Sequence, residues 1–245
     1  MSKDLDLGEQ AISKAVELGL ESQLEQAETL EVSINTDAGK LVQGELDAVE
    51  VKGQGLVMEQ GLRSEKLHLA TNAISINPLK AAVGEIEIEK PVEAKTVVVL
   101  TETDIEAAFN SPYIGQKLET LQIEVEGQTT HIKPHQVEFS IPEIDTICLR
   151  ADVELVQTGE VQKVAFKAQP RMAEAGHQVV LENVEPLDEA KAQPALTQAL
   201  VAVAADLLDL RNFELGDMSL RFERLTVVPG QIKLQAEATI NSLPS

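Results

Sequence analysis

The feature that most constrains this chain is the alternation of apolar and polar residues over unusually long runs. From Glu85 to Leu100, apolar side chains fall on one face of an extended chain, and charged side chains fall on the other. Successive side chains of a β-strand point to opposite faces, so this pattern predicts a strand that buries one face. At ~3.3 Å per residue the strand would be about 50 Å long, which predicts a long, twisted sheet. Pro91 falls on the outward face, which predicts an edge strand or a bulge there.

The same period of two recurs along the chain. It predicts a strand at Leu30, Val32 and Ile34 and another within Gly44–Met58, separated by a turn at residues 37–39. Two further strands are predicted around residues 147–155 and 232–240. The phase of the pattern slips between residues 69 and 74 and between residues 222 and 225, which predicts β-bulges that add curvature.

Three segments have helical periodicity instead. Residues 5–24 carry an apolar stripe and are predicted to form an amphipathic helix. Residues 101–110 open with the Thr-x-x-acid spacing of a capping box, at Thr101 with Asp104 and at Thr103 with Glu106. Residues 188–210 are apolar almost all round, as expected of a helix that a curved sheet surrounds.

These elements predict an α+β fold, in which a long, curved, mainly antiparallel sheet wraps around one or two long helices. No Pro-, Gly- or Ser-rich linker divides the chain, so residues 1–245 are predicted to form a single elongated domain. The run at residues 27–34 is similar to the run at residues 118–125. That similarity leaves open a weak internal duplication of residues 8–100 and 101–210.

Charge and composition exclude several classes of function. The formal net charge of -21 lacks the clustered cations that non-specific nucleic-acid binding requires. It also disfavours electrostatic docking on anionic lipids, so any membrane contact is expected to be transient and apolar. The single cysteine, Cys148, permits no intramolecular disulfide. Neither a signal peptide nor a membrane-spanning run is visible, so we expect a cytoplasmic protein that is at most peripheral to a membrane.

A search for catalytic or metal-binding patterns finds none. His131 and His135 have the H-x-x-x-H spacing, but Pro134 favours an extended backbone that holds the two rings ~13 Å apart. The glycines of Gly53-Gln54-Gly55 fall within a predicted strand, which favours a bulge or a close backbone approach over a phosphate-binding loop. The sequence therefore predicts no enzyme, no metal and no cofactor.

The order of elements resembles that of the LmeA-like phospholipid-binding family. The resemblance rests on the helix GEQAISKAVELGLESQLEQ, the strand AETLEVSINT, the block DAGKLVQGELDAVEVKGQGLVM, the segment LRSEKLHLATNAISINPLKAAVG and the helix start LTETDIEAAFNS. It implies a curved sheet around a helix, akin to the tubular lipid-binding proteins, with an apolar groove for acyl chains. It supplies no residue motif for a site, and we expect this chain to differ from the exported relatives in having no signal peptide.

The first hypothesis is therefore non-enzymatic binding or transfer of a phospholipid, or of another lipid with a fatty acyl chain, in an apolar groove between sheet and helix. The alternative is an acidic interaction or scaffold module with a fully packed core, and an enzyme ranks third. The apolar pattern alone selects the residues predicted to line the groove. They are Ile12, Val16, Leu20, Ile86, Val98, Leu196, Leu200, Val203 and Leu207.

Overall fold

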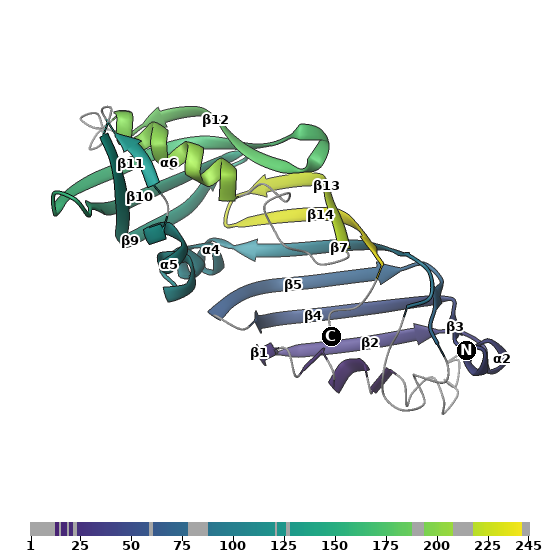
Figure 1. The fold of residues 1–245 in the computed structure, drawn as a ribbon. Helices are drawn as coiled ribbons and strands as arrows, with labels where there is room; N and C mark the ends of the chain where they lie inside the picture. Colours follow the sequence, from purple (N-terminus) through teal and green to yellow (C-terminus); the bar gives the residue numbers. More distant parts are fainter. Residues whose placement is uncertain are drawn as a thin grey trace.

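A computed structural model describes residues 13–14, 16–18, 20–21, 24–58, 61–77, 88–120, 122–125, 128–187, 194–207 and 218–241. Most of these residues belong to long antiparallel strands, which form two open sheets side by side in an elongated molecule (Figure 1). Residues 13–14, 16–18 and 20–21 are helical, within the predicted first helix. Within the described ranges, no helix combines the length and the apolar character needed to cross a bilayer.

The first sheet has seven strands. Its N-terminal strands pair with the C-terminal hairpin of the chain. Its order is β1-β4-β5-β7-β14-β13, with β2 pairing beside β1 on the same edge of β4. The strands are β1 (Leu24–Gln26), β2 (Thr29–Asn35), β4 (Ala48–Met58), β5 (Leu62–Thr71), β7 (Val92–Thr101), β13 (Met218–Val228) and β14 (Gln231–Ile240). The chain thus leaves this sheet after β7 and returns to it with its last hairpin. A short helix, α2 (Ala38–Val42), and the two-residue strands β3 (Glu45–Leu46) and β6 (Ile74–Ser75) lie at one end.

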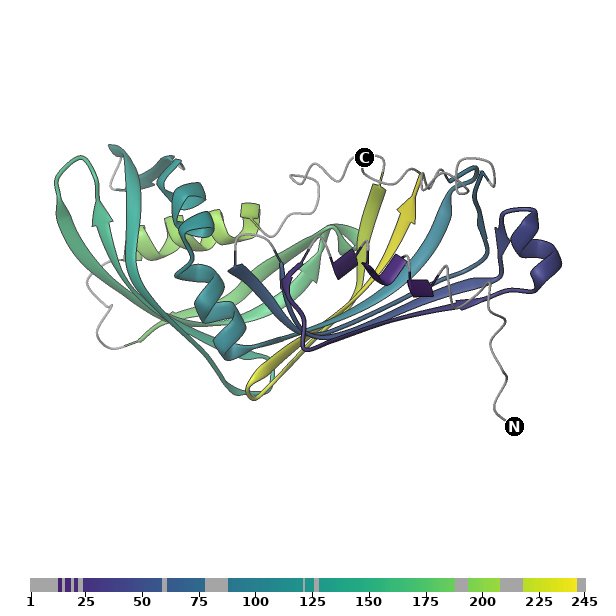
Figure 2. The same ribbon diagram turned by 90° about the horizontal axis from the view of Figure 1, so that it is seen from below.

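The second sheet is built by the intervening residues and has the order β12-β11-β10-β9-β8. Its strands are β8 (Gln122–Val125), β9 (Gln128–Glu143), β10 (Thr146–Leu155), β11 (Glu160–Ala173) and β12 (Gln178–Pro186). Helices α4 (Glu102–Phe109) and α5 (Pro112–Thr120) precede it, and α6 (Pro194–Leu207) follows it. Figure 2 shows that the sheets curve in the same sense and that these helices lie on the concave side.

Backbone hydrogen bonds join the two sheets near the turn between β13 and β14. The Gly230 N–H, in the turn between β13 and β14, donates to the Ile141 carbonyl of β9 at 3.2 Å. The Glu102 N–H, at the start of α4, donates to the Gly230 carbonyl at 3.0 Å. The end of the first sheet is therefore fixed against both α4 and the second sheet.

The buried side chains form two apolar clusters. One lies between β2, β4 and the β3 region and includes Val32, Ile34 and Val51. The larger one lies on the concave face of the second sheet and reaches Leu196 of α6 and Val227 of β13. Both clusters are almost entirely aliphatic, but the larger one includes Phe139 and Phe166.

Several sequence predictions are confirmed. The α+β class, the curved antiparallel sheet and the strands at β2, β10 and β14 are as expected. The register of β13 against β14 shifts between Phe222 and Arg224, which is the predicted bulge. Thr101 caps α4 in a complete capping box with Asp104.

Other predictions are wrong in detail. The slip between residues 69 and 74 is not a bulge, because β5 ends at Thr71 and Ile74 begins β6, which pairs with β3. The turn predicted at residues 37–39 is instead the start of α2, where the Asp37 carboxylate accepts from the Lys40 N–H at 2.9 Å. Pro91 marks neither an edge nor a bulge, because it lies directly before the central strand β7, where no ladder hydrogen bond is required. Residues 85–87 of that predicted strand lie outside the described residues.

The turn between β11 and β12, a 3-10 element η2 (Glu174–Gly176), packs on the edge strand β13. Gly176 has φ 92°, and a Cβ there would lie 2.2 Å from the Phe222 carbonyl oxygen. Gly159 also has a positive φ, of 69°, but has no atom within 4 Å of that position. We expect Gly176→Ala to lower the free energy of unfolding by about 1–3 kcal/mol more than Gly159→Ala, because only the first must displace backbone. Equal losses in urea unfolding would show that this contact is not tight.

Candidate functional site

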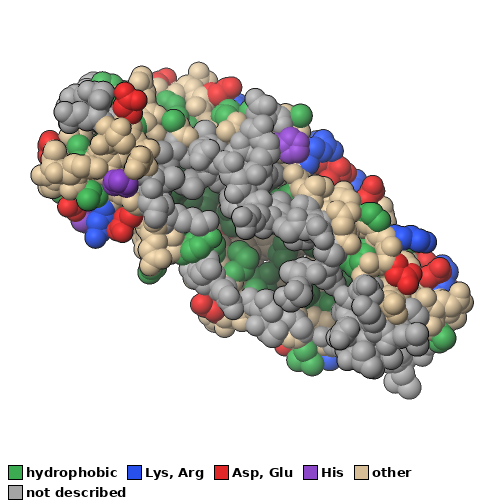
Figure 3. Space-filling view, viewed as in Figure 1, with side chains coloured by type: hydrophobic (Ala, Val, Ile, Leu, Met, Phe, Trp, Pro, Cys, Tyr) green, Lys and Arg blue, Asp and Glu red, His purple; other side chains and the backbone are tan. Residues whose placement is uncertain are grey.

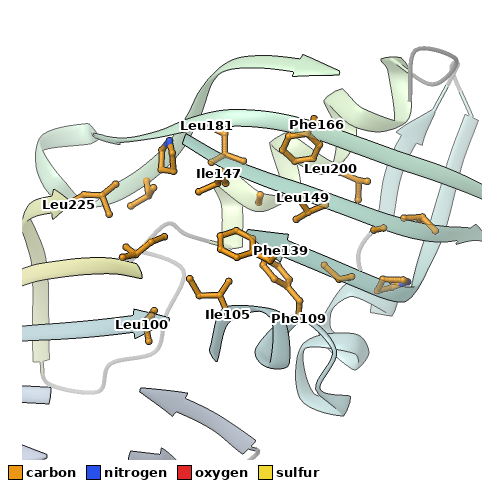
Figure 4. Close-up of a pocket in the computed structure, with 18 of the residues that line it drawn as sticks. Leu100, Ile105, Phe109, Phe139, Ile147, Leu149, Phe166, Leu181, Leu200 and Leu225 are labelled. Atoms are coloured by element: carbon orange, nitrogen blue, oxygen red, sulfur yellow. The ribbon is translucent and has the colours of Figure 1, made fainter. Parts of the chain in front are cut away.

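An apolar cavity of about 250 Å³ lies between the concave face of the second sheet, α4, α6 and the near end of the first sheet (Figure 4). All twenty residues that line it are apolar, and they come from β7, α4, β9, β10, β11, β12, α6, β13 and β14. Ten of them are labelled in Figure 4: Leu100, Ile105, Phe109, Phe139, Ile147, Leu149, Phe166, Leu181, Leu200 and Leu225. The concave face is hollowed near the middle of the molecule, and hydrophobic side chains are visible in the hollow (Figure 3).

The second sheet supplies most of the wall through the side chains that its alternation places on one face. Ile147, Leu149, Ala151 and Val153 of β10 all line the cavity, which confirms that this run shares a face. Cys148 lies between two of them in sequence and therefore points to the opposite face, where it is half-buried. The period of two in β10 thus supplies one strand of the cavity wall.

Aromatic rings are concentrated at this cavity. Phe139 of β9 and Phe166 of β11 are both directly opposite Leu149 of β10, so the three side chains form a row across the sheet. Phe109 of α4 faces this row, and its ring centroid lies 6.2 Å from that of Phe139. Three of the five phenylalanines in the chain therefore line one cavity.

The first sheet lines one end of the cavity. Leu100 of β7, Ile232 and Leu234 of β14 and Leu225 of β13 all line it. Ile232 is directly opposite Leu100, and Leu234 is directly opposite both Leu225 and Val98. The apolar concave face of the first sheet therefore continues into the cavity.

Helix α4 is held against β9 by side chains that take the place of a neighbouring strand. Three side chains one turn apart, two on α4 and the third at its C-cap, accept hydrogen bonds from alternate backbone N–H groups of β9. The pairs are Glu102 with Ile141, Glu106 with Phe139 at 2.9 Å and Asn110 with Val137 at 3.0 Å. The spacings match because one helical turn rises ~5.4 Å, which is close to the ~6.7 Å spanned by two strand residues. The helix thereby covers an open edge of β9. Ile105 and Phe109, on another face of the helix, line the cavity.

Asn110 makes the most complete of these contacts, because its amide also donates to the Val137 carbonyl at 2.8 Å. We expect Asn110→Ala to lower the free energy of unfolding by about 1–3 kcal/mol, since both backbone groups of Val137 lose their partner. The exposed Asn35, at the end of β2, provides a matched control that should change stability by less than about 0.5 kcal/mol. Denaturant unfolding measures both. An Asn110→Ala protein as stable as the control would exclude this role for the side chain.

The other side of α4 is tied to the first sheet by an ion pair whose carboxylate is buried. The Asp104 carboxylate, 4% exposed as a residue, lies 2.6 Å from the Arg63 guanidinium of β5. Arg63 also contacts Glu65 at 3.0 Å and Glu28 at 3.3 Å. The hydrogen bonds to Asp104 and Glu65 raise the pKa of Arg63 above its ordinary value, so this side chain stays charged.

The pKa of Asp104 reflects opposing effects. Burial raises it, but hydrogen bonds from the Thr101 backbone N–H, the Thr101 hydroxyl and Arg63 outweigh burial, so the pKa lies below its ordinary value. The carboxylate is therefore ionised at neutral pH and joins the capping box to the ion pair. One residue thus fixes both the start of α4 and its position against β5.

The structure places the predicted groove residues in several environments. Leu200 of α6 lines the cavity. Val98 is half-buried on the concave face of β7, opposite Leu234. Leu196 is 0% exposed and belongs to the larger core cluster. Val16 packs on the core cluster of the first sheet, and Leu20 is 37% exposed.

The remaining predicted residues have no described side-chain environment. Val203 and Leu207 lie in α6, but their side chains are outside the description. Ile12 and Ile86 lie outside the described residues. The roles of all nine residues in binding remain predictions.

Sequence reasoning missed the aromatic part of the wall. The signals were present, because Val137, Phe139 and Ile141 alternate along β9. Ile105 and Phe109 lie four residues apart on the helix that the capping box predicts. What the sequence did not reveal is that α4 lies over β9, which depends on long-range hydrogen bonds from Glu102, Glu106 and Asn110.

The described residues offer no second site with obvious chemistry. His131 and His135 both lie on the extended strand β9, and His135 instead contacts Glu154 at 2.8 Å. Among the described residues, no three side chains of His, Cys, Asp or Glu gather where they could hold a metal ion. The apolar cavity is therefore the candidate site.

The fold and the cavity define a class of protein, a curved antiparallel β structure with an apolar chamber under its helices. A family model described as LmeA-like phospholipid-binding matches residues 5–237, nearly the whole chain. The chain belongs to the LmeA-like phospholipid-binding family. No curated protein and no solved structure matches it.

Proposed function

We propose that this protein binds phospholipid, or another lipid with an acyl chain, in the cavity beneath α4 and α6 and performs no reaction on it. The observation that carries this proposal is the cavity of about 250 Å³ with a wholly apolar lining. Membership of a phospholipid-binding family supports it independently. The competing hypothesis of a scaffold module rests on a fully packed core, which fits poorly with a chamber of this size.

Burial of an acyl chain supplies enough free energy for binding. Each methylene contributes ~0.8 kcal/mol, so ten would contribute about 8 kcal/mol, the scale of a micromolar dissociation constant before ordering costs. No charged headgroup clamp is needed. The proposal therefore fits a chain whose net charge is -21.

The chemistry of the wall supports binding rather than catalysis. Its residues are aliphatic, aromatic or proline, and none carries a nucleophile or an acid-base group. We further propose that the protein collects its lipid through a transient, apolar contact with a membrane. Transfer between membranes would follow if the lipid also leaves the cavity at a second membrane.

Native mass spectrometry of the purified protein tests the proposal. We expect copurified lipid, or a 1:1 adduct after incubation with phosphatidylcholine vesicles, and lipid extraction should recover the adduct. Protein that is reproducibly lipid-free and also ignores added phospholipid would contradict the proposed function.

A further inference from the structure

We infer that the cavity admits a single alkyl chain, with its size set by Phe109, Phe139 and Phe166, an inference that rests on the proposed function. An apolar cavity of about 150 Å³ accommodates benzene, so by proportion a cavity of this size accommodates about ten carbons. The cavity of this protein has a volume of about 250 Å³. A membrane phospholipid carries two chains, each longer than that, so the space beneath the helices does not hold both of them in full.

The three phenylalanines lie where they limit this volume. Phe139 and Phe166 flank Leu149 in a row across three strands, so both rings lie on the face of the second sheet that lines the cavity. Phe109 approaches from α4 on the other side, 6.2 Å from Phe139 between ring centroids. Phe139 and Phe166 are 7% and 3% exposed, so neither can swing out into solvent without leaving its packing.

The lining also determines what is recognised. It has no polar side chain to pair with a phosphate, glycerol or amine, and burying such a group without a partner is unfavourable. The headgroup therefore stays outside, and the site selects an alkyl chain rather than a headgroup. That chain can belong to a single-chain lipid or to one half of a diacyl phospholipid.

A chain-length series distinguishes a limited cavity from an open groove. Lysophosphatidylcholines with 6 to 16 carbons, each kept below its micelle threshold, are titrated and their adducts quantified by native mass spectrometry. We expect affinity to rise about fourfold per CH₂ up to about ten carbons and then to level off. A rise that continues to 16 carbons overturns the size limit.

A diacyl probe tests whether one or both chains of a phospholipid enter the cavity. Dioctanoyl phosphatidylcholine should bind within about twofold of octanoyl lysophosphatidylcholine, because only one of its two equivalent chains enters. Binding that is more than a hundredfold tighter would place both chains inside and contradict the inference while leaving lipid binding intact. If no probe binds, the proposed function fails with it.

The role of the phenylalanines has a matched control within the chain. Phe139→Leu and Phe166→Leu each remove three carbons from the wall, so the plateau should move to longer chains by two to three carbons. Phe222→Leu makes the same change on β13, at a half-buried position that does not line the cavity, and should leave the plateau unchanged. Thermal unfolding identifies the folded variants. An unmoved plateau in both folded cavity variants would show that these rings do not set its size.

Discussion

Ala204→Phe is expected to weaken phospholipid binding by about four-thousandfold. Ala204 lies on α6 and lines the cavity, so the ring would occupy the space of six carbons in a chamber that holds about ten. At ~0.8 kcal/mol per methylene, displacing six methylenes of the bound chain costs about 5 kcal/mol. The variant should fold, because the added ring fills existing space instead of displacing packed side chains.

Ala202→Phe on the same helix is the matched control. Ala202 is exposed, so its ring would project into solvent and leave the cavity unchanged. Titration of both proteins with the same lysophosphatidylcholine, followed by native mass spectrometry, measures the difference. Wild-type affinity in a folded Ala204→Phe protein would show that the lipid binds elsewhere.

The largest loss of stability is expected for Asp104→Ala, at about 2–4 kcal/mol in the free energy of unfolding, because both the cap and charge-assisted hydrogen bonds are lost. The substitution removes the buried partner of Arg63 and also breaks the capping box at Thr101. The pair of Lys40 and Asp47 is a suitable control, because its side chains lie 2.6 Å apart but are 43% and 45% exposed. Asp47→Ala should cost less than about 1 kcal/mol in urea unfolding, and comparable losses for the two variants would contradict the structural role of Asp104.

The same carboxylate predicts a dependence on pH. The folded pKa of Asp104 is lowered, so its contribution to stability is complete above the unfolded pKa of ~3.9 and is lost as the pH falls through the folded value. The difference in stability between wild type and Asp104→Asn should therefore be constant near neutral pH and should shrink below pH ~4. A difference that does not change down to pH 2.5 would mean that Asp104 titrates normally.

The period-two runs predicted the strands because they decide which face of each strand is buried. The run in β10 even anticipates the cavity wall, since four of its alternating residues line it. The capping box at Thr101 located the start of α4 correctly, because that signal is local. The alternative box at Thr103 did not form, since Glu106 binds the Phe139 N–H instead.

Division into two sheets was not predictable from periodicity. Alternation specifies the faces of a strand but not its neighbours, so nothing local revealed that β14 pairs with β7 across most of the chain length. The cavity depends on the same long-range order, because it joins Leu100 of β7 to Leu225 of β13 and Phe139 of β9. The family resemblance supplied the expectation of an apolar groove, and the internal duplication and single-domain organisation stay predictions.

Contacts between a bound acyl chain and leucine methyl groups test the central claim most directly. In protein with labelled leucine methyls, protonated lysophosphatidylcholine should give intermolecular NOEs to Leu149, Leu200 and Leu225, which line the cavity. Leu46, in the separate core of the first sheet, should give none. NOEs confined to leucines outside the cavity, with none to these three, would contradict binding beneath α4 and α6.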